Sequence, residues 1–518
     1  MVVSLSSGKT ERRKGAPAGG LVGFPWLARG DVTFAVVAGL VVIQAVIRFV
    51  SPLSGDVAWY LYAASRLLDG ATLYKDVIEV SSPLGLWAAV PVVALARSIA
   101  VNPIPVLKGI LLLLSLASLF LSARLLTLAR DIPAEIRNLI LVALAAFMLF
   151  LPGADFGQRE HVAILLVTPW LLLQWHRVAG RDAPIGLAIL AGILAAPGFL
   201  LKPHFIFAFV AVVLVVATVN RKWRNAMRLE SLAVLLFLAA YLVVAQSLLP
   251  DRVQMSTLGT WTFIPFYGEP LGDLALRLAL PAVIVLAAVL SAARGDERLQ
   301  PLQTIFVVAG MAFLFAGFVQ VGLAYQFLPA LYCLSLAASI AIAGLISESP
   351  PDLRRVVAIA TFATAILLVI GESLMRQVPV GRGPLLATAV AREAPDTDTL
   401  FVASNSVDDA FPLVVEKDLV WAARFPRQWF LRFAAATLVG DGAPDNYMVR
   451  FFLDSTVGDL VALSPDIVFV EREEAAAERD AFDHLRFWRR DHRFEQFWLG
   501  YEERAPIVGF SVYVRKNS

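Results

Sequence analysis

The sequence predicts a polytopic α-helical membrane protein with about eleven transmembrane helices, followed by a C-terminal soluble α/β domain. The first observation is composition: 58% of the 518 residues are hydrophobic and 17% are charged. A soluble globular chain is typically about 45–50% apolar and about 25% charged. The second is a series of apolar runs, each long enough to cross a hydrocarbon core of about 30 Å as a helix. The third is a return to ordinary charge density after about residue 375.

Charge and motifs exclude several classes of protein. The net charge of +2 gives no global preference for nucleic acid. The single cysteine, Cys333, lies in an apolar run and excludes an internal disulfide or a cysteine-rich metal site. The sequence contains no nucleotide-phosphate loop, zinc-type His/Glu motif or nucleophile elbow. The missing phosphate loop argues against a pump driven by a nucleoside triphosphate.

The N-terminal segment does not resemble a cleavable signal. Basic residues between Lys9 and Lys14 are followed by a Gly/Pro-rich stretch, and the apolar run begins only near Val32. This run is too long for a signal peptide and has no clean small-residue cleavage site before Asp56. We therefore expect residues 1–31 to form a cytoplasmic tail and the run to be the first membrane anchor.

Further apolar runs extend the membrane domain, residues 32–374. We predict helices at about 32–51, 107–128, 138–152, 161–176, 184–200, 204–219, 231–249, 273–293, 302–322, 325–346 and 355–374. Helices of this length leave their backbone hydrogen bonds satisfied inside each segment, as the bilayer requires.

Basic residues gather in alternate loops, as the positive-inside rule expects of cytoplasmic loops. The clusters are the N-terminal group, Arg130 with Arg137, Arg177 with Arg181, the group from Arg221 to Arg228, Arg294 with Arg298, and Arg354 with Arg355. The opposite loops carry mostly single basic residues, namely Arg159, Lys202 and Arg252. This alternation predicts a multi-pass protein of the bacterial inner membrane, with a cytoplasmic N-terminus and a periplasmic C-terminal domain.

The first external loop, residues 52–106, contains two apolar stretches. Counting residues 83–101 as a further span would invert the later loops, so we predict an interfacial or re-entrant segment there. Within residues 56–68, Trp59, Tyr60 and Leu67 lie along one helical stripe together with two alanines. This pattern predicts a helix in the membrane interface with its aromatic side chains at the level of the lipid headgroups.

Residues 375–518 read as the soluble domain. Strand-like runs occur at 399–404, 466–471 and 509–514, and a charged helix-like stretch covers 471–490. A segment of about 140 residues is long enough to have its own core.

Polar side chains near a membrane are costly, and those that remain are candidates for function. Asp56 follows the first predicted helix directly, and a capping role for the next helix is the alternative to a catalytic one. Asp76 and Glu79 stand three residues apart in the same loop. Two such carboxylates can hold a metal or a substrate hydroxyl, or simply face solvent.

A run of polar residues opens the fourth predicted helix, with Arg159, Glu160 and His161 in sequence. An arginine there can hold phosphate through its planar fork of donors. A histidine can transfer a proton or bind a metal. The alternative is an interfacial anchor built on an Arg–Glu pair.

Lys202 and His204 flank a proline between two apolar runs. A cation in such a place fits a phosphate or carboxylate site, and a snorkelling lysine in a tight turn is the alternative. Tyr325 and Gln326 begin the tenth predicted helix, where they can belong to the site or to an aromatic belt. The predicted topology puts all these candidates on the periplasmic face.

In order and placement, these features resemble the GT-C superfamily of membrane glycosyltransferases, in the branch of the protein O-mannosyltransferases and the lipid A aminoarabinose transferase. The matching segments are Asp56, residues 70–79 (GATLYKDVIE), Ser82-Pro83-Leu84, residues 158–161, Lys202-Pro203, residues 325–329, Phe411-Pro412-Leu413 and Arg424-Phe425-Pro426. In relatives this segment often reads Pro-Pro-Leu and is preceded by a basic residue or a histidine. This chain has Ser81-Ser82-Pro83-Leu84 at that place.

The resemblance implies an inverting transfer of a sugar from a polyprenyl-phosphate donor to a lipid, polysaccharide or protein of the cell envelope. It implies that Asp56 is the general base and that Asp76 and Glu79 position the acceptor. The implied donor and lipid-phosphate site comprises Arg159, Glu160, His161, Lys202, His204, Tyr325 and Gln326. This scheme requires no cofactor, although the carboxylates can hold a divalent metal. A transporter or flippase, or another envelope glycolipid transferase or polymerase, is the alternative.

Overall fold

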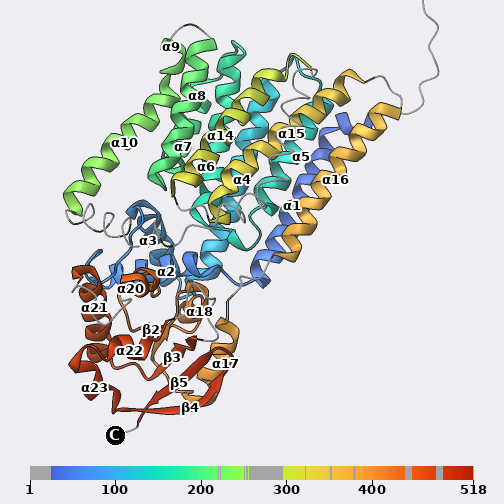
Figure 1. Cartoon of the computed structure of the whole chain (residues 1–518). Helices are drawn as coiled ribbons and strands as arrows, with labels where there is room; N and C mark the ends of the chain where they lie inside the picture. Colours follow the sequence, from blue (N-terminus) through green and yellow to red (C-terminus); the bar gives the residue numbers. More distant parts are fainter. Residues whose placement is uncertain are drawn as a thin grey trace, which may run out of the picture.

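The computed structural model shows a bundle of long helices joined at one end to a smaller domain that contains a β-sheet (Figure 1). The structure describes residues 25–219, 221, 223–249, 251, 255, 259, 266, 296–320, 323–349, 353–376, 381–437, 446–473 and 482–516.

Long helices run up and down the bundle in alternation (Figure 1). They are α1 (Gly30–Val50), α4 (Pro103–Leu128), α5 (Ala134–Phe150), α6 (Arg159–Val178), α7 (Ile185–Leu200), α8 (Ile206–Val219), α10 (Leu229–Leu248), α14 (Gln300–Gln320), α15 (Leu328–Glu348) and α16 (Leu353–Met375). Helices thus occupy the predicted ranges, except 273–293, which lies outside the described residues.

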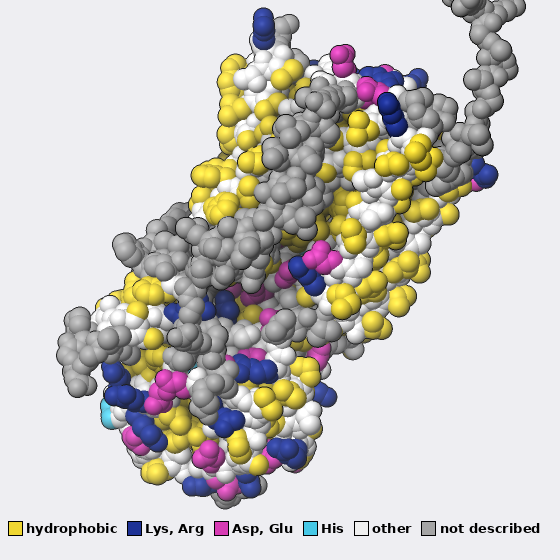
Figure 2. Space-filling model, turned by 45° about the vertical axis from the view of Figure 1, so that its right-hand side comes forward, with side chains coloured by type: hydrophobic (Ala, Val, Ile, Leu, Met, Phe, Trp, Pro, Cys, Tyr) yellow, Lys and Arg dark blue, Asp and Glu magenta, His cyan; other side chains and the backbone are white. Residues whose placement is uncertain are grey.

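Among the described residues, six helices are long and apolar enough to cross a membrane: α1, α4, α10, α14, the segment Ala324–Glu348, and α16. Shorter apolar helices cover Pro83–Ser98, Ile185–Leu200 and Pro203–Val219. The chain is therefore a membrane protein, and the number of eleven spans stays a prediction. Figure 2 shows hydrophobic side chains over the flank of the bundle, while charged side chains are frequent on the C-terminal domain.

Short helical elements flank the long helices at both ends of the bundle. They are η1 (Pro25–Ala28), η2 (Gly153–Asp155), η3 (Pro203–Phe205), α9 (Trp223–Ala226) and η4 (Ala324–Phe327). Local sequence explains several boundaries. Asn102 accepts a hydrogen bond from the Ile104 N–H at 2.9 Å and caps α4, whose first residue is a proline.

The first external loop folds into α2 (Gly55–Leu68) and α3 (Pro83–Ser98), which lie between the bundle and the C-terminal domain (Figure 1). The prediction that the α2 aromatic side chains lie at the level of the lipid headgroups is wrong, because Trp59 is 2% exposed and Tyr60 8% exposed. The Trp59 ring packs edge-on against Phe411 of the C-terminal domain, with 5.6 Å between the centroids. The apolar stripe of α2 therefore faces protein.

The C-terminal domain is built on a five-stranded mixed sheet in the order β2-β1-β3-β5-β4. Its strands are β1 (Thr399–Ala403), β2 (Val420–Trp421), β3 (Ile467–Glu471), β4 (Tyr501–Ile507) and β5 (Phe510–Arg515). Strands β2, β1 and β3 are parallel, and β5 pairs antiparallel with both β3 and β4. The three predicted strand runs are confirmed as β1, β3 and β5.

Helices surround this sheet. They are α17 (Gly383–Glu393), α18 (Val407–Ala410), α19 (Leu413–Glu416), α20 (Leu431–Thr437), α21 (Tyr447–Leu463), α22 (His484–Trp488) and α23 (His492–Trp498). Of the helix-like stretch predicted over 471–490, Glu471 ends β3 and α22 covers His484–Trp488, while residues 474–481 lie outside the described part.

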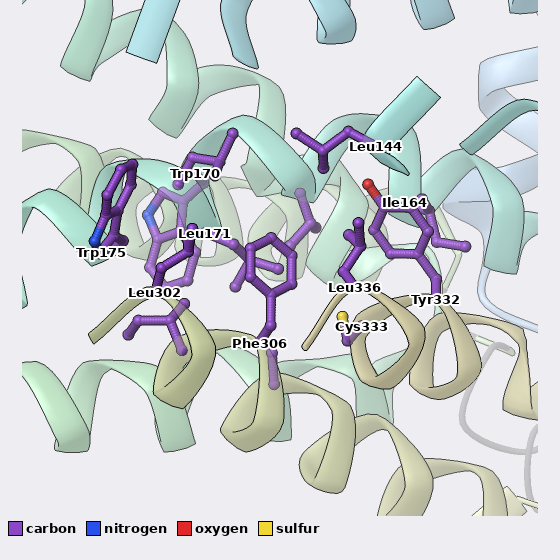
Figure 3. Close-up of a cluster of buried hydrophobic side chains, with 14 of the residues drawn as sticks. Leu144, Ile164, Trp170, Leu171, Trp175, Leu302, Phe306, Tyr332, Cys333 and Leu336 are labelled. Carbon is purple, nitrogen blue, oxygen red and sulfur yellow. The ribbon is translucent and has the colours of Figure 1, made fainter. Parts of the chain in front are cut away.

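Among the described residues, the two largest apolar cores hold the molecule together. The first fills the bundle, where Trp170, Phe306 and Tyr332 pack between α6, α14 and α15 (Figure 3). The Tyr332 hydroxyl accepts a hydrogen bond from Thr168 at 3.0 Å, which satisfies a polar group inside this core. The second core joins α2, α3 and the C-terminal sheet into one unit.

Candidate functional site

A cavity of about 390 Å³ lies where the bundle meets the C-terminal domain. Its volume falls in the range of roughly 300–1,000 Å³ that is usual for small-molecule sites. Several parts of the chain line it: α2 with the segment after it, the start of α6, the α7–α8 connection, Gly259, the end of α14, η4, and the segment 426–429. The polar lining residues are Asp56, Glu79, Ser81, Ser82, Arg159, Lys202, His204, Gln320, Tyr325, Gln326 and Arg427.

Asp56 stands in the first turn of α2 with its carboxylate at this cavity. The residue in the N-cap position is Ser54, and its side chain makes no capping hydrogen bond, so Asp56 is not the cap. Gln158 donates a hydrogen bond from Nε2 to Asp56 Oδ2 at 3.3 Å. The positive end of the α2 dipole favours a carboxylate at this place.

Arg159 begins α6 and brings a buried guanidinium to the cavity. The guanidinium lies over the Tyr60 ring, 5.3 Å from its centroid. A Cβ added at Gly85 would lie 3.2 Å from Arg159 Cδ, so glycine lets the side chain cross α3. Among the described residues, the buried Nε has no hydrogen-bond partner. A buried cation with an unused donor favours an anionic ligand.

Lys202 and Glu160 form a buried ion pair beside Arg159, with side chains 2% and 0% exposed. The Lys202 ammonium also lies 5.3 Å from the centroid of the Tyr325 ring. Glu160 Oε2 has no hydrogen-bond partner within the described residues. Removing one member of such a pair leaves the other charge buried, which typically costs about 3–5 kcal/mol. The burial of Lys202 argues against the alternative of a snorkelling lysine.

The remaining donor-site candidates complete the wall near η4. His204 and Gln320 approach each other at 3.1 Å between Nε2 and Oε1, and both line the cavity. Gln326 accepts a hydrogen bond from the Leu323 N–H at 3.0 Å, which holds the turn that carries Tyr325.

His161 does not reach the cavity. Its Nδ1 accepts a hydrogen bond from the Gly157 N–H at 3.1 Å, and its Nε2 lies 3.1 Å from the Met148 carbonyl. Both ring nitrogens are therefore used to hold the turn between α5 and α6, and the ring packs on Phe156.

The two loop carboxylates have separate environments. Glu79 is buried, and its Oε2 accepts a hydrogen bond from the Trp59 indole at 2.9 Å. Asp76 instead accepts from the Thr72 N–H at 2.8 Å in a turn, away from this cavity. The structure therefore brings Glu79, but not Asp76, together with Asp56.

The sequence analysis missed Arg427 and Trp429 of the C-terminal domain, which line the cavity, and Asp408, which contacts the start of α2. Arg427 lines the cavity and donates a hydrogen bond from Nη1 to the Asn405 carbonyl at 2.8 Å. Asp408 Oδ1 accepts a hydrogen bond from the Gly55 N–H at 2.6 Å. A Cβ added at Gly55 would lie 2.8 Å from Asp408 N, so this close approach requires glycine. Arg427 follows the Arg-Phe-Pro segment in the sequence, whereas nothing local singles out Asp408.

Burial and the nearby Asp56 carboxylate raise the pKa of Asp408 from 3.8 to about 6, although the Gly55 N–H acts in the opposite direction. Burial, followed by the negative charges of Glu160 and Asp56, raises the pKa of Asp155 from 3.8 to about 7. Negative charge thus accumulates around Asp56, and neighbouring carboxyl groups take up protons more readily.

We expect the Asp408→Asn variant to be more stable than wild type, by a margin that grows as the pH rises from about 4 to about 6. The unfolded carboxyl ionises near 3.8, whereas the folded one resists ionisation until about 6, so wild-type stability falls as pH rises through this window. An asparagine does not titrate, and its oxygen still accepts from Gly55. Melting temperatures at pH 4.5 and 7.5 test this, with the exposed Asp396→Asn as control. A pH-independent difference would contradict it.

Within the residues that the structure describes, no three His, Cys, Asp or Glu side chains are grouped so as to hold a metal ion. The binding of a divalent metal stays a prediction of the sequence analysis.

Comparison of the sequence with protein-family models and with curated proteins finds no match. Among solved structures, the chain is similar to the arabinofuranosyltransferase AftD from Mycobacteria, determined by single-particle cryo-EM, with a TM-score of 0.46 and 16% identity over 93% of this chain. A mutant of that protein gives a TM-score of 0.47 and 16% identity over 96% of this chain. This chain spans 40% and 42% of the lengths of those two chains.

Proposed function

We propose that the protein is a glycosyltransferase of the bacterial inner membrane that moves a sugar from a polyprenyl-phosphate donor to a cell-envelope acceptor. One observation carries this proposal: a single cavity at the end of the helical bundle presents the Asp56 carboxylate together with the buried Arg159 guanidinium and the Lys202 ammonium. A base and a set of anion-binding cations in one cavity suit transfer from a phosphate leaving group.

In the proposed reaction, Asp56 takes the proton from the acceptor hydroxyl as its oxygen attacks the anomeric carbon of the donor. The bond between that carbon and the phosphate oxygen breaks, and the phosphate leaves with the electron pair. Attack from the face opposite the phosphate inverts the anomeric configuration.

The cations stabilise the charge that develops on the leaving phosphate. Arg159 has an unused Nε donor, and Lys202 adds a second positive charge next to it. Their charge-assisted hydrogen bonds are strong in a site that excludes water. Arg427 brings a third cation from the C-terminal domain.

Glu79 supports the same cavity by holding Trp59, whose indole N–H it accepts. We assign acceptor positioning to this pair, with the periplasmic face as the side on which acceptor and donor meet. The side is proposed from the alternation of basic loops.

Transfer by purified protein in detergent micelles tests this proposal against a transporter or flippase. Micelles have no two sides, so a transferase works in them, whereas a flippase produces no new glycosidic bond. The donor mixture is the polyprenyl-phosphate sugars extracted from the source strain. The acceptors are envelope glycolipids and glycans of a deletion strain.

We expect mass spectrometry to show that the deletion strain lacks one envelope sugar and that wild-type protein adds it in micelles. An unchanged envelope in the deletion strain, or a missing sugar without transfer in micelles, would reject the proposal. The second outcome would favour the flippase.

A further inference from the structure

A second hollow, of about 160 Å³, lies beside the cavity on the other side of Trp59. The indole of Trp59 lines both spaces and forms their common wall. The hollow is smaller than the roughly 300–1,000 Å³ of a complete ligand site. It therefore fits one unit of a larger ligand better than a whole one.

Three segments of the chain contribute to both spaces. Helix α2, residues 76–82 and residues 421–429 contribute lining residues to both spaces. The Ile78 N–H donates a hydrogen bond to the Arg424 carbonyl at 2.8 Å and ties two of these segments together between the spaces. The cavity and the hollow thus follow one another along the line where the C-terminal domain meets α2.

The charged side chains that line the hollow are equally positive and negative, unlike a site that attracts anions. Arg66 and Arg424 bring two positive charges, and Asp76 and Asp459 bring two negative ones. Arg424 is held by Asp459 at 2.6 Å, so one cation is already neutralised. Paired donors and acceptors of this kind bind a neutral molecule with many hydroxyl groups and disfavour an isolated phosphate.

Aromatic rings complete the wall of the hollow. Tyr62 and Trp421 line it with Trp59, and Tyr62 is fixed because its hydroxyl accepts a hydrogen bond from the Trp421 N–H at 3.0 Å. Flat apolar rings beside charged hydrogen-bonding groups match the two kinds of surface on a sugar ring.

We propose that this hollow is a secondary subsite for a sugar unit of an oligosaccharide or polysaccharide acceptor. Tyr62 and Arg66 follow Asp56 by six and ten residues, which places them about 9–15 Å further along α2 at about 1.5 Å per residue. A sugar in the hollow is then one or more units away from the hydroxyl that Asp56 deprotonates. The proposal rests on the proposed function for one point only, namely that the acceptor chain runs from the hollow toward Asp56. Saccharide binding in the hollow is measured without turnover and does not depend on that point.

The test is saccharide binding to the full-length protein in detergent, measured by isothermal titration. The probes are oligosaccharides released from the envelope of the deletion strain by mild acid and separated by size into monosaccharides and tetrasaccharides. We expect the wild type to bind the tetrasaccharide fraction more tightly. Asp76→Asn and Arg66→Gln each weaken that binding about tenfold, as expected for loss of a hydrogen bond to a charged group.

Binding is measured without the lipid donor, so failed transfer and failed saccharide binding are separate results. Melting temperatures show whether Asp76→Asn and Arg66→Gln are folded. Equal binding by folded variants and wild type, or no binding to wild type, would overturn the proposal. Displacement of the saccharide by inorganic phosphate would also overturn it, by indicating an anion site.

Discussion

Replacing Asp56 by asparagine is expected to reduce the rate of sugar transfer on the order of 10²–10⁴-fold, the usual contribution of a general base. The amide keeps the size of the carboxylate but cannot take the proton of the acceptor hydroxyl. Gln158 can still approach the amide oxygen, so the start of α2 keeps its local contact. The measurement is kcat for transfer by purified protein, together with the melting temperature.

The matched control is Asp69→Asn at the other end of α2. Asp69 is exposed and pairs with Arg97 at 2.8 Å, away from the cavity. Such surface pairs contribute at most about 1 kcal/mol, so transfer should stay within about a factor of two of wild type. If Asp56→Asn transfers sugar at the wild-type rate, Asp56 is not the base.

Replacing Arg159 by glutamine is expected to lower kcat on the order of 10²–10³-fold, as loss of a charge-stabilising donor does in other enzymes. The described residues show no carboxylate bonded to Arg159, so the substitution orphans no buried anion. The kcat of Arg159→Lys should lie between those of wild type and Arg159→Gln, because a lysine supplies the charge without the planar fork of donors. The readouts are kcat and the KM for the lipid donor.

The control is Arg124→Gln, at an exposed place near the opposite end of the bundle. Lys202 is a poorer test of the same idea, because its removal leaves Glu160 buried and unpaired. A folded Arg159→Gln variant with unchanged kcat would show that the guanidinium does not meet the developing charge.

Apolar length and periodicity were sufficient to predict the long helices and three of the strands. The run at 467–471 is buried throughout, and its four consecutive apolar residues, 467–470, suit an inner strand. The environment of α2 was predicted wrongly, because an apolar stripe has the same period whether it faces lipid or protein. What covers it is decided by residues about 350 positions away, such as Phe411 and Trp421.

The site could be predicted only in part, because a sequence shows which residues are adjacent but not what each side chain faces. Adjacent residues at 159–161 point about 100° apart around a helix. Arg159 therefore faces the cavity, Glu160 meets Lys202, and His161 turns inward to Gly157. Sequence shows that three polar residues are adjacent but not which direction each takes. The contribution of Arg427 depends on the docking of the C-terminal domain, which leaves no local signal.

The apolar core shared by α2, α3 and the C-terminal sheet means that the C-terminal domain is not a detachable module. Cut free at residue 381, it would present to water the surface that now covers Trp59 and Ala63. The hydrogen bond from the Gly55 N–H to Asp408 holds the same junction, and a side chain at position 55 would clash with Asp408. Hybrid proteins made from related chains would therefore need to exchange residues 52–106 and the C-terminal domain together.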